Sequence, residues 1–343
     1  MRFKTVTSPH VLADRSVGQV MRRVLYAMTP GIVALVWFFG WGVLINLALA
    51  TVVALVAEAA VLTVRGKPLA LYLGDYSAVT TAWLLAVALP PLAPWWLTTI
   101  GVVSAIVIAK HLYGGLGYNP FNPAMVGYVV LLISFPREMS AWLIPYGVGQ
   151  PHALGLLDTL RIIMGGTGGI TLDGLTGATP LDVLRTKLGL GLTVTEIRNS
   201  PVFGIVAGRG WEWATLGFLA GGLWLVFTRT AAWQIPVGML GGLALIATIF
   251  HLVDPLRYAP PWFQVWSGAA IYGAFFIATD PVTASTTARG RLIYGAGIGV
   301  LVYIIRSFGG YPDGVAFAVL LMNIAAPTID LYTQPRVFGA RSG

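Results

Sequence analysis

A polar segment near the middle of the chain has the residue types that a covalent attachment site needs. Residues 173–179 read Asp-Gly-Leu-Thr-Gly-Ala-Thr, and a proline follows. Thr179 offers a hydroxyl, and Gly177 and Ala178 leave room for an enzyme to close over it. Asp173 supplies an acidic group for recognition, and the following proline favours an extended backbone that presents Thr179 outward. The pattern predicts a flavin attachment site, with FMN joined to the Thr179 hydroxyl as a phosphoester.

The same residues also fit an ordinary loop. Gly-Ala-Thr is a common tripeptide, and Asp173 and Asp182 are of a type that forms turns and caps helices. What favours the attachment site is its setting, because this polar segment interrupts a chain that is otherwise almost entirely apolar.

The composition predicts an integral membrane protein. Of the 343 residues, 57% are hydrophobic and 10% are charged, and apolar runs of membrane-spanning length recur from Val24 to Ala326. A β-barrel would alternate apolar and polar residues, whereas residues 44–62 are apolar on every face. We therefore expect an all-α polytopic fold in the lipid bilayer.

Charge and cysteine content narrow the function further. In a polytopic protein the net charge of +8 reports orientation, so we expect no nucleic-acid partner. The chain has no cysteine, which excludes iron-sulfur clusters held by its own thiolates. If electrons pass through this chain, an organic cofactor must carry them. The four histidines have no paired spacing, so no metal site is predicted.

Apolar runs between charges and Pro/Gly breaks give about ten spans. Several are shorter than the roughly 20 residues of a full crossing, which suggests broken half-helices buried in protein. The spans are residues 23–40, 42–64, 76–90, 95–110, 122–136, 214–228, 235–251, 264–279, 291–305 and 314–327.

The distribution of Lys and Arg predicts the orientation. With the N-terminus inside, most basic residues lie on the cytoplasmic side, and only Arg257 and Arg306 fall in short external connections. Both termini are then cytoplasmic. The predicted organisation is a cytoplasmic segment at 1–22, a five-helix repeat at 23–136, an extracytoplasmic loop with the attachment site at 137–213, a second five-helix repeat at 214–327 and a cytoplasmic tail at 328–343.

The repeat is inferred from a pattern that occurs in both halves. Residues 108–115 read Ile-Ala-Lys-His-Leu-Tyr-Gly-Gly, and residues 305–310 read Ile-Arg-Ser-Phe-Gly-Gly. Each places a cation and a Gly-Gly break at the end of an apolar span. Five spans per half make the second copy inverted, which puts a site between the halves near mid-membrane. The alternative is chance similarity between glycine-rich segments.

Charged residues within apolar spans have two interpretations each. Glu58 is a lone carboxylate in an apolar helix, so it is a candidate for an ion pathway, as a proton relay or Na⁺ ligand, or for a structural ion pair. Lys110 and Arg306 occupy matching places in the two halves, where they could neutralise a flavin or phosphate, or close helix C-termini. Asp75, Asp280 and Asp313 lie at span ends and are candidates either for caps and turns or for a role in a site.

Several motifs together resemble a known family. They are Ser8-Pro-His10, Gly74-Asp-Tyr-Ser-Ala78, Tyr113-Gly-Gly-Leu-Gly117, Phe121-Asn-Pro-Ala-Met125, Thr176-Gly-Ala-Thr-Pro-Leu-Asp182, Ala278-Thr-Asp-Pro281 and Gly310-Tyr-Pro-Asp-Gly-Val-Ala-Phe317. The chain resembles RnfD, a membrane component of the Rnf ion-translocating oxidoreductase complex and a relative of NqrB in the sodium-translocating NADH:quinone reductase. Its short length and short N-terminus favour the Rnf component.

The resemblance implies a role in electron transfer within a bacterial inner membrane. FMN would be bound covalently to Thr179 outside the cytoplasm, after maturation by a flavin transferase. Electrons would pass between flavins, coupled to Na⁺ or H⁺ transport by the whole complex, while ferredoxin and NAD react at other subunits. Partners would include iron-sulfur subunits and a flavin-bearing extracytoplasmic subunit. The chain would act as part of this translocase and would not be catalytic alone.

The resemblance also implies a second, non-covalent flavin, riboflavin. Asn119 and Asn122 are the candidates near a flavin, since an amide can both donate to and accept from the ring edge. Their alternative role is to cap the helix that starts near Pro123. A different function also remains open, namely a small-solute channel or permease with inverted repeats, in which Thr179 is inert. A scaffold that only orients redox partners is a third hypothesis.

Overall fold

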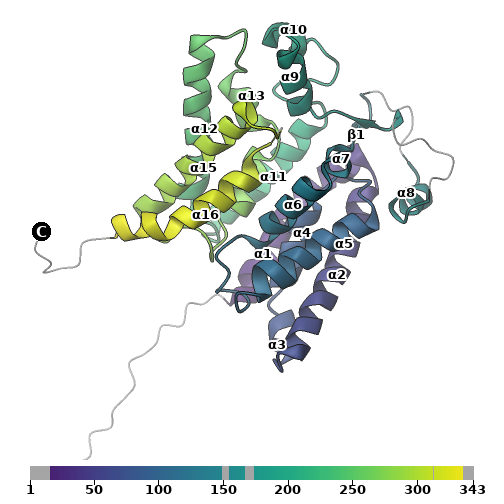
Figure 1. The fold of residues 1–343 in the computed structure, drawn as a ribbon, viewed down its shortest axis with the longest axis vertical. Coiled ribbons are helices and arrows are strands. Elements are labelled where there is room, and N and C mark those ends of the chain that lie inside the picture. Colours follow the sequence, from purple (N-terminus) through teal and green to yellow (C-terminus); the bar gives the residue numbers. More distant parts are fainter. Residues whose placement is uncertain (1–15, 149–153, 167–173, 312, 335–343) are drawn as a thin grey trace, which may run out of the picture.

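The computed structural model is almost entirely helical (Figure 1). It describes residues 16–148, 154–166, 174–311 and 313–334. Five helices are long and apolar enough to cross a membrane, as expected for an all-α membrane protein. They are α1 (Val17–Phe39), α2 (Gly42–Val64), α12 (Gln234–Val253), α15 (Ala288–Phe308) and α16 (Val315–Tyr332).

Shorter apolar helices account for the other predicted spans. With a rise of about 1.5 Å per residue, the ten-residue helix α4 covers only about 15 Å, half the hydrocarbon thickness. The short segments are α4 (Ser77–Ala86), α5 (Trp95–Val103) with the π-helical η1 (Ser104–His111), α6 (Pro123–Ser134), α11 (Trp211–Phe227), and α14 (Ala270–Tyr272) with the π-helical η3 (Gly273–Ile277).

The predicted span 264–279 is not one helix. Helix α13 (Pro261–Trp266) ends before Gly268, whose φ of +62° places it in the left-handed region, and α14 starts two residues later. This is a region that glycine enters without steric cost. The run of apolar residues continues through the turn, which is why hydropathy alone could not locate the break.

Local sequence signals explain where several helices begin. Ser16 and Gln19 form a capping box at α1, and Thr287 accepts a hydrogen bond from the Gly290 N–H at α15. Asn122 caps α6, with proline at the first helical position. The break after α4 is closed from α2, because the Asn46 amide donates to the carbonyls of Pro90 and Pro91, at 3.2 and 3.1 Å.

The first and second halves of the chain occupy different sides of the molecule in Figure 1, purple to blue and green to yellow. Helix α2 packs on α4 and α5, and α12 packs along α15. Helix α1 packs along α11, and α6 meets α16, so both of these contacts join the two halves.

The segment predicted as a long external loop contains ordered elements of its own. They are α7 (Pro136–Ser140), β1 (Trp142–Leu143), α8 (Leu156–Ile163), β2 (Thr176–Gly177), α9 (Pro180–Gly189) and α10 (Val194–Arg198). The strands pair antiparallel, with Trp142 opposite Gly177 and Leu143 opposite Thr176. Helices α9 and α10 share a small apolar core with Phe203 and Phe263. The segment is thus a folded cap over one end of the bundle.

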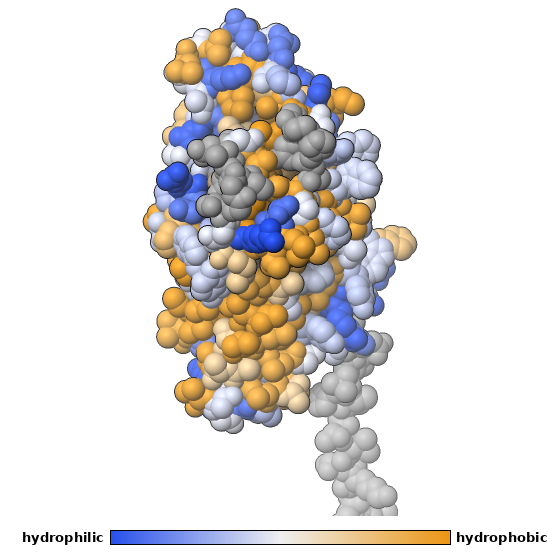
Figure 2. Space-filling model, turned by 90° about the vertical axis from the view of Figure 1, so that its right-hand side faces the viewer, coloured by the Kyte–Doolittle hydropathy of each residue, from blue (hydrophilic) through white to orange (hydrophobic). Residues whose placement is uncertain are grey.

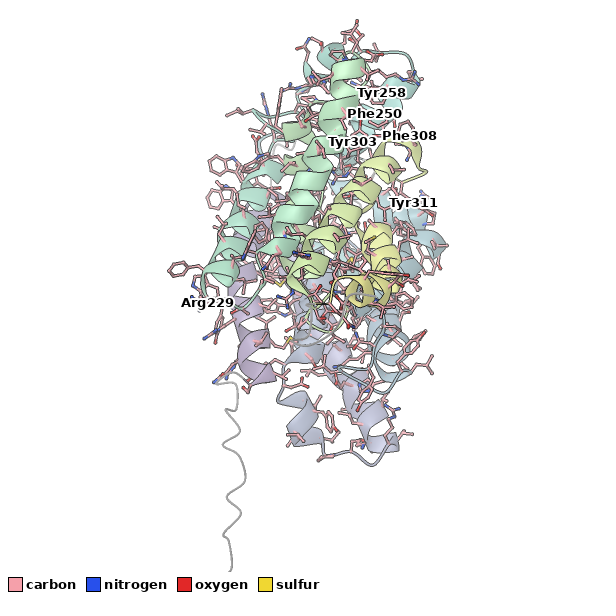
Figure 3. All side chains as sticks on the ribbon, turned by 90° about the vertical axis from the view of Figure 1, so that its left-hand side faces the viewer. Arg229, Phe250, Tyr258, Tyr303, Phe308 and Tyr311 are labelled. Carbon is pink, nitrogen blue, oxygen red and sulfur yellow. The ribbon has the colours of Figure 1, made fainter. Side chains whose placement is uncertain are left out.

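The surface is consistent with a membrane environment. Figure 2 shows hydrophobic side chains gathered over the middle and lower part of one face, and hydrophilic side chains toward its upper end. On α2, Val52, Val56 and Val64 are all exposed. In Figure 3, Phe250, Tyr258, Tyr303 and Phe308 gather near one end of α12 and α15, and Arg229 lies at the opposite end. Exposed apolar surface of this extent suits contact with lipid.

Small residues let α1 and α11 approach closely. A Cβ added at Gly221 would overlap the Ala27 carbonyl oxygen, and one at Gly217 would lie 2.8 Å from the Gly31 Cα. Glycine at such positions allows the backbones of membrane helices to touch.

We expect Gly221→Ala to destabilise the protein by about 1–3 kcal/mol, since the methyl group must push α1 and α11 apart. The matched control is Gly241→Ala on α12, where an added Cβ meets nothing within 4 Å. Thermal unfolding in detergent should show a lower midpoint for Gly221→Ala alone. Equal midpoints for both variants would contradict the close packing of these helices.

Candidate functional site

Thr179 is the residue that caps helix α9. Its Oγ1 accepts a hydrogen bond from the Asp182 backbone N–H at 3.3 Å and donates one to Oδ2 of the Asp182 carboxylate at 2.6 Å. Pro180 fills the first helical position, where no N–H is needed. The Thr179 side chain is half-buried. The structure therefore holds the hydroxyl in one orientation at the start of a helix.

The small residues beside Thr179 are required by packing. A Cβ added at Gly177 would lie 2.9 Å from Cγ1 of Ile144, and one added at Gly208 would overlap Cγ of Pro180. Ala178 is exposed. The predicted recognition residue Asp173 lies outside the described residues. Residues 176–180 are thus packed between Ile144, which follows β1, and Gly208 in the loop before α11.

A cavity of about 320 Å³ opens beside Thr179. Its size lies within the range of ligand sites in proteins. Thr179 and Asp182 form part of the wall, and the cavity reaches inward as far as Ile277. Most of its lining is apolar, and it includes the aromatic side chains of Tyr128, Trp142, Trp211, Phe218, Tyr272 and Tyr311.

One residue that lines this cavity has a fully buried side-chain oxygen without a hydrogen-bond partner in the described part of the chain. This is Oγ of Ser267, in a residue that is 2% exposed. A buried hydroxyl without a partner is costly. The aromatic walls of the cavity fit a heteroaromatic ligand.

The turn above this cavity is held by an ion pair between α15 and the start of α16. Arg306 donates from Nη2 to Oδ1 of Asp313 at 3.1 Å and to the Ser267 carbonyl at 3.0 Å. It also donates from Nη1 to the Gln264 carbonyl at 2.6 Å. Oδ2 of Asp313 accepts from the Ala269 N–H at 2.6 Å. Arg306 therefore fixes the break before α14, the structural alternative of its two predicted roles.

Asn119 and Asn122 do not line the cavity beside Thr179. They line a second cavity of about 70 Å³. Asn122 caps α6, accepting from the Met125 N–H at 3.2 Å, and donates to the Ile277 carbonyl at 3.3 Å. The predicted capping role is thus present. Oδ1 of Asn119 is buried and has no partner among the described residues, while its amide nitrogen donates to the Phe121 carbonyl.

Glu58 forms a buried ion pair with Lys110. The Lys110 Nζ lies 2.7 and 2.8 Å from the two carboxylate oxygens, and it also donates to Oγ of Ser77 at 2.7 Å. Nε2 of His111 lies 3.3 Å from Oε1 of Glu58. Both partners of the pair are 1% exposed. The structural alternative predicted for Glu58 is therefore present, and Lys110 is the partner that sequence alone did not identify.

Aromatic rings lie between the two cavities. Tyr272 lines the first and Phe276 the second, and their rings stack with centroids 5.6 Å apart. Phe218 packs on both rings, and the Tyr272 hydroxyl donates to the Leu84 carbonyl at 2.8 Å. No sequence pattern indicates this layer, since it combines rings from α11 and from the short helix α14–η3.

Removing one partner of the buried pair should cost more than removing both. We expect Lys110→Met to destabilise the protein by about 3–5 kcal/mol, because the Glu58 charge is left buried without its partner. Glu58→Gln combined with Lys110→Met should recover part of that loss. Thermal unfolding of the single and double variants tests this.

The control for this experiment is the exposed pair on α8, where Nη1 of Arg161 lies 3.5 Å from Oδ1 of Asp158. Arg161→Met should change the midpoint little, since exposed pairs contribute about 0–1 kcal/mol. Strictly additive losses for Glu58→Gln and Lys110→Met would contradict coupling between the two residues.

Comparison with known proteins identifies relatives along the whole chain. The NQR2, RnfD, RnfE family matches residues 4–339. The D component of the ion-translocating oxidoreductase complex of Alcanivorax borkumensis is 54% identical over 344 residues, which cover 100% of this chain and 98% of the relative. The protein of the same name from Escherichia fergusonii is 54% identical over 353 residues, covering all of both chains. With a match of this extent, the chain belongs to the NQR2, RnfD, RnfE family.

Proposed function

We propose that the chain is the RnfD membrane component of an Rnf ion-translocating oxidoreductase complex and that it carries FMN covalently on Thr179. One observation carries the cofactor assignment: the Thr179 hydroxyl stands at the wall of an aromatic-lined cavity of about 320 Å³. The assignment to the complex is supported by full-length similarity to proteins named as its D component.

A second threonine, in the same folded segment over the end of the bundle, shows why the cavity matters. Thr193 caps α10, donates to Oε2 of Glu196 at 2.8 Å and accepts from the Glu196 N–H at 3.3 Å. This is the geometry of Thr179 and Asp182. Thr193, however, does not line the cavity, and its interaction with Glu196 is solvent-exposed. Threonine with an acid three residues later is thus a helix cap, and the adjoining cavity is what distinguishes Thr179.

The residues around Thr179 have separate tasks in this proposal. When bound, FMN supplies a ring system that accepts and releases electrons. Trp142 and Trp211 line the cavity and would pack against the ring system. The phosphoester keeps the cofactor from being lost on the outer side of the membrane.

The second cavity is the candidate site for a non-covalent flavin, riboflavin, and includes Asn119 and Asn122. Its volume of about 70 Å³ is too small for the ring system without movement of side chains. Electron passage between the two sites would cross the layer of Tyr272 and Phe276. Partners on either side would be the other subunits of the complex.

Glu58 is our candidate for the ion pathway. It is buried in α2, and the second cavity is lined by its partner Lys110 and by Ser77, which accepts a hydrogen bond from Lys110. Because Lys110 binds both carboxylate oxygens, Glu58 would accept a proton or a cation only when Lys110 moves away. The pair would then act as a gate for Na⁺ or H⁺.

We propose that the two halves are inverted repeats with both termini in the cytoplasm. In support, Lys110 donates to Oγ of Ser77 at the start of α4, and Arg306 donates to the Ser267 carbonyl before α14. Lys110 and Arg306 each lie at the end of the fourth predicted span of their half. Each binds a residue near the start of the third predicted span of the same half. The two contacts lie at opposite cavities, as inversion requires.

A small-solute channel remains the alternative function. It is favoured by the presence of two cavities, one lined by Tyr272 and the other by Phe276, whose rings stack on each other. In a channel Thr179 would stay unmodified, which separates the two hypotheses.

We expect Thr179→Ala to abolish covalent flavin in protein made together with its flavin transferase. Flavin fluorescence of the denatured polypeptide in a gel is the measurement, since only a covalent cofactor survives denaturation. Thr193→Ala, which removes the matching cap hydroxyl, should keep full fluorescence. Fluorescence that persists in Thr179→Ala would place the cofactor on another residue.

The absence of cysteine makes the topology testable with single cysteines. Leu190→Cys on the cap should react with a membrane-impermeant maleimide in intact cells, because we place the cap outside. Lys67→Cys, in the connection after α2, should react only after the inner membrane is permeabilised. Both side chains are exposed in the structure. The reverse pattern of labelling would invert the proposed orientation.

A further inference from the structure

The hydroxyl of Thr179 has a specific partner for its proton. The distance from Oγ1 to Oδ2 of Asp182 is 2.6 Å, at the short end for a hydroxyl–carboxylate hydrogen bond. The Asp182 backbone N–H donates to the same Oγ1 at 3.3 Å. The proton of Oγ1 is therefore directed to the carboxylate, and one lone pair of the oxygen is held by the helix. The remaining lone pair is available for bond formation.

Asp182 is held in place by the fold of the cap. It occupies the third position of α9, and its neighbours Leu181 and Leu184 are buried in the small apolar core of the cap. Arg185 donates to the Gly310 carbonyl and ties α9 to the connection between α15 and α16. A carboxylate fixed within hydrogen-bond distance of a hydroxyl is the arrangement that activates hydroxyl nucleophiles.

We propose that Asp182 is the base that activates Thr179 for flavin attachment, so that this chain supplies part of the chemistry of its own maturation. The inference rests on the proposed function, in which Thr179 carries FMN. It adds to that function a role for a residue that is not itself modified.

The step must start from an activated donor. Esterification by free FMN would have to expel water, whereas a flavin dinucleotide such as FAD offers a phosphoanhydride bond. Thr179 Oγ1 forms a bond to the phosphorus next to the flavin, and the bond from that phosphorus to the bridging oxygen breaks. The proton of Oγ1 passes to Oδ2 of Asp182 and then to the departing nucleoside monophosphate. Nothing is oxidised or reduced.

A purely structural role for Asp182 makes a different prediction. Glu196 binds Thr193 in the same way, and there the pair only caps a helix. If Asp182 did no more than this, its replacement would change the stability of α9 but not the rate of attachment to a folded chain. Glu196→Gln is therefore the matched control for Asp182→Asn.

The experiment follows modification of the full-length chain in time. Protein purified in detergent from cells without the flavin transferase is mixed with that enzyme and FAD. Mass spectrometry of the peptide that contains Thr179 then gives the attachment rate. Asn keeps the shape of Asp but cannot accept the proton, so Asp182→Asn should slow attachment about 100-fold or more. Glu196→Gln should leave the rate unchanged.

Two further measurements keep the test decisive if Asp182→Asn disturbs the fold. The thermal midpoint of each variant reports folding, and formate added to Asp182→Ala can replace the missing carboxylate. Slow attachment to Asp182→Asn at an unchanged midpoint, or rescue of Asp182→Ala by formate, supports the proposal. A normal rate for Asp182→Asn overturns it, as does slow attachment that accompanies a lowered midpoint without formate rescue. A wild-type chain that is never modified would instead refute the proposed function itself.

Discussion

The structure depends on one constraint, that backbone groups freed by a broken helix in a membrane must find partners within the protein. Three of the breaks have a side-chain partner from another part of the chain. Asn46 of α2 binds the carbonyls of Pro90 and Pro91 after α4, Asn122 binds the carbonyl of Ile277, and Arg306 binds the carbonyls before α14. These bonds stabilise short helices that could not cross a bilayer alone, and they place α4 and α14–η3 inside the bundle.

The short helices make room for the two cavities and for the layer between them. Where α14–η3 runs beside α11, the rings of Tyr272, Phe276 and Phe218 fill the space that separates the cavities. The folded cap then brings Thr179 to the mouth of the larger cavity through the β1–β2 pair and the clamp of Gly208 on Pro180. The same packing that orders the cap also directs the Thr179 hydroxyl toward Asp182. A few close contacts thus connect the membrane bundle to the position and orientation of the Thr179 hydroxyl.

Sequence analysis predicted the features that arise within single stretches of chain. The ten apolar runs each contain a helical segment, although 264–279 is interrupted at Gly268, and the cap of α6 by Asn122 follows from local pattern. It did not predict the helices α9 and α10, whose apolar residues do not form a run of membrane-spanning length and whose core includes Phe263 from far along the chain. The cavity beside Thr179 could not be predicted from the sequence either, because its wall combines residues of α6, α11, α14 and α16. An ion pair was one of the two roles predicted for Glu58, but its partner Lys110 was not identified. No local sequence rule relates residues on different helices.

The most direct test of the central claim, that Thr179 is esterified to FMN, is the mass of one peptide from the native complex. Trypsin cleaves after Arg161 and Arg185, and residues 162–185 contain Thr179 and no other cleavage site. The account predicts that this peptide gains the mass of FMN less one water, with fragmentation placing the addition on Thr179. An unmodified peptide from a complex that was made alongside its flavin transferase would contradict it.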